Sequence, residues 1–197
     1  MSLYHYTFGQ TPIDEEEKQG LIPILFTREQ LNAFEQDNIE EARRWAMRKT
    51  TLRRSDVLTE SFLLRLHKRM YQHVWTWAGT LRTSNKNIGV PFYQVPIELR
   101  SLLDDARYWL EHSTYTHTEL AVIFHHRLVK IHLFPNGNGR HARLCADIMI
   151  AQYGASPLTW GGTVDLGEES TIRKRYISAL RKADEGDYEA LLAFAVA

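Results

Sequence analysis

The chain has 197 residues, of which 24 are basic and 24 acidic, so its formal net charge is zero. This balance disfavours proteins that bind nucleic acid or membrane surfaces through overall charge, and any anion site must be local. The single cysteine, Cys145, excludes an intrachain disulfide. Residues 1–10 lack the pattern of a secretory signal, and no apolar run approaches membrane-spanning length. We therefore expect a cytoplasmic protein.

The N-terminal part of the chain is expected to be an extension that carries one long helix. An irregular segment is predicted over residues 1–26 by the breakers Pro12, Gly20 and Pro23. Thr27 and Gln30 have the spacing of a capping box, which predicts a helix from there to about residue 49. Helical periodicity assigns its inner face to Leu31, Phe34, Ile39, Ala42 and Trp45. We expect residues 1–54 to pack on a domain formed by residues 55–197, as one structural unit.

The remainder of the chain is dominated by amphipathic helical patterns. Such helices are predicted over about residues 56–71, 96–112, 116–131, 139–154, 168–184 and 187–196. Thr116 and Glu119 form a second capping box, and Asp187 is placed to cap the last helix. Residues 77–96 differ, because apolar residues flank a polar stretch there, which is typical of a β-hairpin. The predicted fold class is all-α: a helical bundle with one β-hairpin flap.

Residues 132–143, His-Leu-Phe-Pro-Asn-Gly-Asn-Gly-Arg-His-Ala-Arg, carry the pattern with the most specific chemistry. Gly137 and Gly139 allow the main chain to approach a ligand closely, and the loop leads directly into a helix. Free N–H groups and the helix dipole at such a start bind anions. Arg140 and Arg143 lie on one face of the first turn, where an anion would offset their unfavourable interaction with the dipole. Guanidinium groups also match phosphate oxygens.

His132 ends the preceding helix beside this loop. A neutral imidazole at this place can take the proton from an attacking hydroxyl at physiological pH. Phe134 is expected to be buried and to fix the loop. A lone Gly-Asn-Gly is usually a simple turn, and a lone histidine at a helix end is usually a cap. Because these features occur together within twelve residues, they favour phosphoryl or nucleotidyl transfer.

The same segment resembles the signature of the Fic family, H-P-F-x-[D/E]-G-N-G-R-x-x-R. Two neighbouring stretches are also similar to this family. Residues 74–96, VWTWAGTLRTSNKNIGVPFYQVP, resemble the hairpin that clamps the target chain, and residues 124–144, FHHRLVKIHLFPNGNGRHARL, resemble the core helix pair. The resemblance covers about residues 55–155. The C-terminal LRKADEGDYEALLAFA, residues 180–195, is similar to a subgroup called mobile mystery protein B.

The resemblance implies a reaction and a role for each matching residue. The family typically transfers AMP from ATP to a Ser, Thr or Tyr hydroxyl of a target protein, with Mg²⁺ and release of pyrophosphate. His132 corresponds to the general base. The nucleotide phosphates would be held by Gly137, Asn138, Gly139, Arg140 and Arg143. The edge of the hairpin that pairs with the target backbone would be formed by Lys86, Asn87, Ile88, Gly89 and Val90.

Two positions of the signature differ in this chain. Leu133 replaces the proline, and Asn136 replaces the acidic residue that normally holds Mg²⁺. An amide oxygen can ligate Mg²⁺ but lacks the charge that hard cations favour. Either the metal is held mainly by the nucleotide phosphates, or the donor differs. Fic-type transfer of another phosphate-containing group and a non-catalytic nucleotide-binding module therefore stay open as alternatives.

Other readings of the sequence are weaker. A metal site would need several of the histidines His125, His126, His132 and His141, but the acidic partners and short spacings of zinc enzymes are missing. A helical nucleic-acid binder is disfavoured by the zero net charge. The family's inhibitory motif, [S/T]-x-x-x-E-[G/N], has no complete match, since Glu16 follows the partial match from Thr11 to Glu15. An inhibitor would then be a separate protein, as in a toxin–antitoxin pair.

Overall fold

The computed structural model describes residues 11–162 and 171–197. Its elements, in chain order, are α1 (Glu15–Lys18), α2 (Arg28–Ala46), α3 (Lys49–Arg54), α4 (Glu60–Tyr71), the short 3-10 helix η1 (Phe92–Gln94), α5 (Val95–Glu111), α6 (His117–Ile131), α7 (Asn138–Gln152), α8 (Thr171–Asp184) and α9 (Glu189–Val196). The predicted helical architecture is therefore confirmed. No helix within the described residues is long and apolar enough to cross a membrane.

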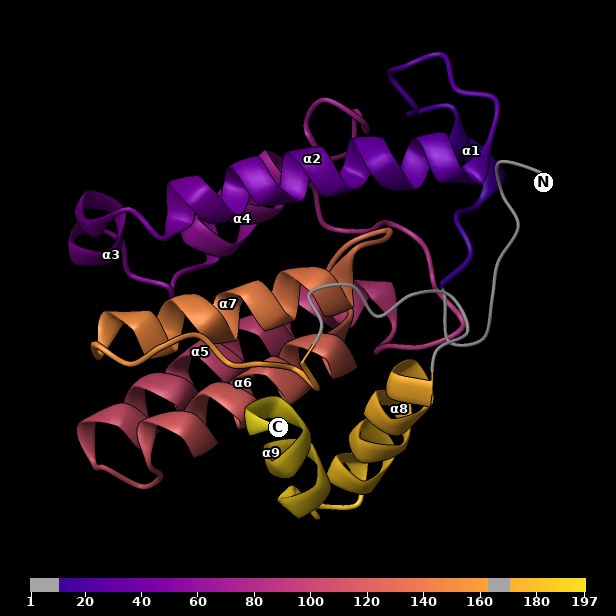
Figure 1. Ribbon diagram of the computed structural model, residues 1–197. Coiled ribbons are helices and arrows are strands. Elements are labelled where there is room, and N and C mark those ends of the chain that lie inside the picture. Colours follow the sequence, from indigo (N-terminus) through magenta and orange to yellow (C-terminus); the bar gives the residue numbers. More distant parts are fainter. Residues whose placement is uncertain (1–10, 163–170) are drawn as a thin grey trace.

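Helices α6 and α7 form the centre of the molecule. Helix α6 packs against α7 on one side and α5 on the other, while α2 lies along α4 and α8 pairs with α9 (Figure 1). The hydrophobic core extends from Ile13 to Ala195, so the N-terminal extension and the C-terminal helices share it. The loop between α6 and α7, residues 132–137, is thereby held between two helices whose apolar faces are buried.

Local sequence signals explain several helix starts. The capping boxes predicted at Thr27 and at Thr116 are both present, with Gln30 and Glu119 as the reciprocal partners. The Asp187 carboxylate accepts a hydrogen bond from the backbone N–H of Glu189 (3.0 Å), the first residue of α9, although the N-cap position is Tyr188 and not Asp187 as predicted. Each such cap satisfies backbone donors that the first helical turn leaves without a partner.

The predicted inner face of α2 is wrong in part. Phe34 is 46% exposed, whereas the buried positions are Leu31, Glu35, Asn38, Ala42 and Ala46. The register is decided by partners on other elements. The Glu35 carboxylate accepts a hydrogen bond from Trp75 Nε1 (2.8 Å), and the Asn38 amide oxygen accepts one from the His73 backbone N–H (3.3 Å). These contacts turn two polar side chains inward and Phe34 outward.

The predicted β-hairpin over residues 77–96 is not present as a hairpin. The described part of the chain contains no β-strand, and its isolated antiparallel bridge joins Leu21 to Trp75. Residues 80–91 form an irregular loop around the buried guanidinium of Arg82, which donates to the carbonyls of Ser84 and Val90. Gly89 has φ +99°, which is incompatible with an extended strand. A side chain therefore holds this loop in place of a cross-strand ladder.

Candidate active site

The candidate base, His132, lies where α6 ends and the motif loop begins. Its backbone is left-handed (φ 60°), so the chain turns sharply out of the helix and directs the loop towards α7. Arg82 fixes this turn, because its Nε donates to the His132 carbonyl (2.6 Å) and its guanidinium also donates to the Ile131 carbonyl (3.3 Å). The imidazole is 4% exposed, and Gly89 passes directly against its Cβ.

The pKa of His132 is lowered to about 4, from an ordinary value of 6.5. Burial is the largest cause, and the positive charge of Arg82 adds to it. The ring is therefore neutral at physiological pH and has an unprotonated nitrogen that can accept a proton. Its Nε2 lies 3.2 Å from Oγ1 of Thr11.

Two residues hold the motif loop in shape. Phe134 is fully buried, as predicted, and stacks on the His67 ring with centroids 3.6 Å apart. The Asn138 side chain binds the backbone of Phe134 in both directions, accepting from its N–H (2.9 Å) and donating to its carbonyl (2.8 Å). The Asn138 side chain thus stabilises the loop. A phosphate could then contact Asn138 only through its backbone.

Gly137 makes the turn into α7. Its φ is +79°, and a Cβ there would lie 2.5 Å from the Tyr71 hydroxyl oxygen, so the position demands glycine in two ways. No side chain caps the start of α7 at this residue. Gly139 lies in the first turn, where a Cβ would meet only ordinary contacts at 3.7 Å or more. The first turn of α7 therefore presents backbone N–H groups beside small residues, as an anion site requires.

Arg140 and Arg143 both line the cavity next to this helix start. The Arg140 guanidinium forms an ion pair with Glu35 (2.7 Å) and lies over the Tyr71 ring, with 5.3 Å from Cζ to the centroid. Arg143 lies over the Tyr176 ring, 5.4 Å from its centroid. The two predicted phosphate ligands are thus brought to one cavity of about 900 Å³, which His132 and Gly137 also line.

Asn136 does not present a free ligand for a metal ion. Its amide oxygen accepts hydrogen bonds from the Gly137 N–H (2.7 Å) and from Arg140 (3.4 Å), while its Nδ2 donates to the Thr11 carbonyl (3.0 Å). No group of three or more His, Cys, Asp or Glu that could hold a metal occurs within residues 11–162 and 171–197. The described residues therefore do not form a protein-held Mg²⁺ site.

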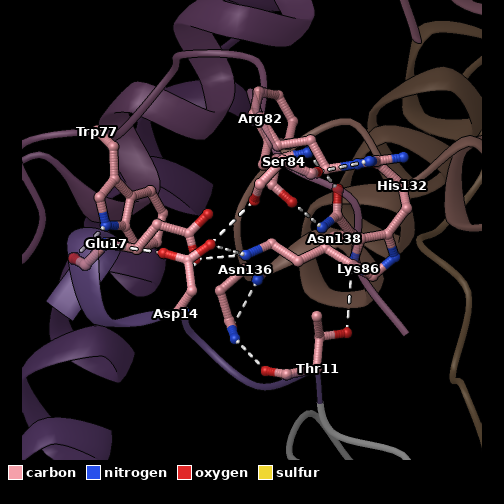
Figure 2. Close-up of polar contacts among 12 residues, drawn as sticks. Thr11, Asp14, Glu17, Trp77, Arg82, Ser84, Lys86, His132, Asn136 and Asn138 are labelled. Carbon is pink, nitrogen blue, oxygen red and sulfur yellow. Dashed lines mark hydrogen bonds and ion pairs between the residues drawn. The ribbon is translucent and has the colours of Figure 1, made fainter. Parts of the chain in front are cut away.

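The loop predicted to bind a target is divided by the structure. Asn87, Ile88 and Gly89 are exposed and, with Val90, line the edge of the cavity. Lys86 instead turns its nearly buried ammonium group towards the N-terminal segment, where it pairs with Asp14 (3.0 Å) and Glu17 (Figure 2). The main chain of the exposed residues remains available to a partner, whereas the Lys86 side chain holds the loop against α1.

The four histidines of the metal hypothesis do not converge. His125 hydrogen-bonds with the Tyr176 hydroxyl (2.9 Å), and His126 contacts Asp184 (3.1 Å) and Tyr188 (3.0 Å). His141 Nε2 lies 3.0 Å from the Leu63 carbonyl oxygen of α4. Each of these rings therefore has a hydrogen-bond partner on another element, which is α8 for His125 and His126 and α4 for His141.

Sequence reasoning missed four residues at this site: Thr11, Glu35, Arg82 and Asp147. Glu35 left a signal, because a carboxylate four residues after Leu31, three before Asn38 and seven before Ala42 lies on the buried face of a helix. Asp147 follows Arg143 by four residues on α7 and lines the same cavity. It accepts from the Leu158 N–H and from Trp160 Nε1, and burial raises its pKa to about 6. Arg82 and Thr11 left no signal in the sequence, since long-range contacts alone bring them to His132.

The chain is similar in sequence to a known protein family and to curated enzymes. The Fic/DOC family matches residues 57–150. The protein adenylyltransferase Fic of Drosophila virilis is 30% identical over 141 residues, which are 70% of this chain and 27% of that protein. The enzyme of the same name from Culex quinquefasciatus is 29% identical over 149 residues, 74% of this chain and 28% of that protein. The chain therefore spans about a quarter of the length of these curated relatives.

Solved structures share the fold. Fic-1 of C. elegans, residues 134–508 with E274G, has a TM-score of 0.62 and 26% identity over 81% of this chain and 46% of its own. BepC of Bartonella tribocorum, a VirB-translocated effector solved with bound AMPPNP, has a TM-score of 0.64. The match to BepC covers 98% of this chain and 95% of that one at 17% identity, so it supports the fold alone.

Proposed function

Because residues 57–150 of this chain belong to the Fic/DOC family, we propose that the protein is an adenylyltransferase that moves AMP from ATP to a Ser, Thr or Tyr hydroxyl of a protein. The curated relatives are named protein adenylyltransferases, which supports this choice of reaction. The observation that carries the proposal is the place of His132. A neutral imidazole nitrogen contacts a hydroxyl at 3.2 Å, at the entrance to a glycine loop flanked by two arginines.

Each part of the site has a task in this reaction. His132 Nε2 takes the proton from the acceptor hydroxyl as its oxygen bonds to the α-phosphorus of ATP. Backbone N–H groups at the start of α7 hold the phosphate oxygens, and Gly137 makes the left-handed turn that leads into this helix. Arg140 and Arg143 neutralise charge that develops on the phosphates as pyrophosphate leaves. The substrate is MgATP, with the metal held by the nucleotide because Asn136 is engaged elsewhere.

A target chain would approach along the exposed loop residues Asn87, Ile88 and Gly89, beside the cavity. This edge lies against His132, since a Cβ on Gly89 would be 2.6 Å from the His132 Cβ. A backbone pairing at this edge would place a target hydroxyl near Nε2. The toxin–antitoxin role, the separate inhibitor protein, the mobile mystery protein B subgroup and the cytoplasmic location stay predictions.

The second candidate is Fic-type transfer of another phosphate-containing group, and the neutral Asn136 at the signature's acidic position favours it. The two are separated by incubating the chain and candidate target proteins with ATP labelled on either the α- or the γ-phosphate. Adenylyl transfer requires α-label on protein and γ-label in pyrophosphate. Label from the γ-phosphate on protein would replace the proposal with phosphoryl transfer. Nucleotide binding without release of pyrophosphate would make the protein a binding module.

A further inference from the structure

The N-terminal segment places a hydroxyl of the chain itself on the candidate base. Thr11 Oγ1 lies 3.2 Å from His132 Nε2, and both residues are buried, at 7% and 4% exposure. The backbone of Thr11 is also bound, because the Asn136 amide nitrogen in the motif loop donates to the Thr11 carbonyl (3.0 Å). Thr11 is therefore held from both sides, by the base and by the phosphate loop (Figure 2).

The residues that follow Thr11 fasten the segment to the loop beside the site. Asp14 accepts from the Ser84 hydroxyl (2.9 Å) and from Lys86 Nζ (3.0 Å), while Glu17 also pairs with Lys86 (Figure 2). The Trp77 indole N–H donates to the Glu17 carbonyl (3.1 Å). The Lys86 side chain is only 4% exposed and the Glu17 side chain 12%, so salt screens this pair less than the pair with Asp14, whose side chain is 43% exposed.

Backbone pairing continues the attachment. The Thr76 N–H donates to the Gly20 carbonyl (2.8 Å), and the Ile22 N–H donates to the Val74 carbonyl (2.9 Å). Residues 11–22 thus run from His132 past Ser84 and Lys86 of the loop to residues 74–76, with a hydroxyl on the base at one end and a main-chain pairing at the other. This is the arrangement that the reaction demands of an acceptor chain.

We propose that Thr11 is an acceptor of the protein's own transfer reaction, modified within the same chain; this rests on the proposed adenylyltransferase function. The Thr11 Oγ1–H proton passes to His132 Nε2, Oγ1 bonds to the α-phosphorus of a nucleoside triphosphate, and the bond from that phosphorus to the leaving pyrophosphate breaks. The products are a Thr11 phosphodiester of the nucleoside monophosphate and pyrophosphate. Because the ring is neutral, its tautomer with the proton on Nδ1 leaves Nε2 able to accept the Thr11 proton.

The test uses the full chain with MgATP labelled on the α-phosphate, followed by intact mass and peptide mapping. We expect up to one nucleoside monophosphate per chain, on Thr11. Thr11→Ala should reduce label on the N-terminal peptide to background, and Thr11→Ser should retain it. Other hydroxyls in that peptide, on Ser2, Tyr4, Tyr6 and Thr7, serve as internal controls. Label on one of them in the wild type, with Thr11 unlabelled, would overturn the assignment.

Three further experiments test the geometry. The fraction labelled per unit time should not change on dilution. In a mixture of His132→Ala with Thr11→Ala, the intact Thr11 of the inactive chain should stay unlabelled, and label there would exclude modification within one chain. Combining Asp14→Asn with Glu17→Gln should slow labelling of Thr11 several-fold, whereas Glu16→Gln, an exposed neighbour, should not. Equal rates in both would show that the attachment to Lys86 does not position Thr11.

Release of pyrophosphate and labelling of Thr11 distinguish failure of this inference from failure of the proposed function. If the wild type releases pyrophosphate or labels other proteins while Thr11 stays unmodified, the function stands and Thr11 only fills the site. If neither the wild type nor Thr11→Ala releases pyrophosphate or transfers α-label, the proposed function fails and the inference fails with it.

Discussion

Glu35 on α2 and Arg140 on α7 form an ion pair 2.7 Å long, which joins a helix outside the matched family region to the first arginine of the phosphate loop. The Glu35 side chain is 4% exposed and the Arg140 side chain 32%. A nucleotide phosphate that approaches Arg140 therefore competes with a buried carboxylate already in place. The same carboxylate accepts from Trp75 Nε1, so it also fixes α2 on the core.

Glu35→Gln should raise nucleotide affinity. The amide oxygen can still accept from Trp75, while the negative charge that competes for Arg140 is removed. Loss of a charge-assisted contact of about 1.5 kcal/mol corresponds to roughly a tenfold change in Kd, which sets the upper range of the gain. Isothermal titration with a non-hydrolysable ATP analogue measures it. The exposed Glu29→Gln on the same helix is the control, and weaker binding in Glu35→Gln would show that the pair positions Arg140 for phosphate.

The two glycines of the motif loop should differ in their effect on stability. Gly137→Ala places a side chain at φ +79° against Tyr71 and should lower the free energy of unfolding by at least about 1–2 kcal/mol. Gly139→Ala meets contacts of 3.7 Å and longer and should leave stability nearly unchanged. Thermal unfolding of both variants checks this. Equal losses would mean that the left-handed turn into α7 is not the constraint.

The activity should persist below the ordinary pKa of histidine. The folded-state pKa of His132, about 4, lies below its ordinary 6.5, so kcat/KM for ATP should stay level from about pH 8 to about pH 5.5. The free energy of unfolding depends on pH in the opposite direction to that of a protein in which a histidine has a carboxylate partner. Below pH 6.5 the unfolded chain binds protons that the folded His132 does not, so the free energy of unfolding falls as pH falls towards 4.

The pH profile must therefore be measured where circular dichroism shows the fold intact. A half-maximal kcat/KM near pH 6.5 in folded protein would mean that His132 is not held neutral by burial, or that another group is the base.

Asn136→Asp should lower the Mg²⁺ concentration needed for half-maximal transfer, because a carboxylate adds the charge that the amide lacks. The same substitution removes the Nδ2 donor to the Thr11 carbonyl, so it should also loosen the N-terminal segment. Asn136→Ala separates the two effects, since it removes the donor without adding charge. A Mg²⁺ titration at saturating ATP compares all three proteins. An unchanged or higher Mg²⁺ requirement in Asn136→Asp would show that a carboxylate at this position does not reach the metal of the bound nucleotide.

Local signals predicted most of the helices. The capping boxes at Thr27 and Thr116 are satisfied within four residues of chain, so their outcome does not depend on the rest of the fold. Phe134 was placed correctly in the core because an aromatic side chain between two apolar helices has few other environments. The grouping of His132, Arg140 and Arg143 at one cavity was likewise expected, since the chain between them is short.

Where the sequence pattern predicts the wrong structure, long-range contacts are the reason. Phe34 is the more apolar choice for the inner face of α2, yet Glu35 is buried because Trp75 and Arg140 both offer it hydrogen-bond donors. The apolar residues that flank a polar stretch predict a hairpin over residues 77–96, but the buried Arg82 draws the backbone carbonyls around itself. Thr11 reaches the site across 121 residues of sequence, which no local pattern reports.

Transfer of α-label from ATP to protein by the wild type and by His132→Ala, compared at equal concentration, tests the central claim most directly. The exposed His112→Ala is the matched control, and far-ultraviolet circular dichroism establishes that all three chains are folded. We predict label on protein with the wild type and with His112→Ala, and a reduction of at least about a hundredfold with His132→Ala, because the base is lost. Near-wild-type labelling by folded His132→Ala would contradict the assignment of His132 as the base and with it the proposed mechanism.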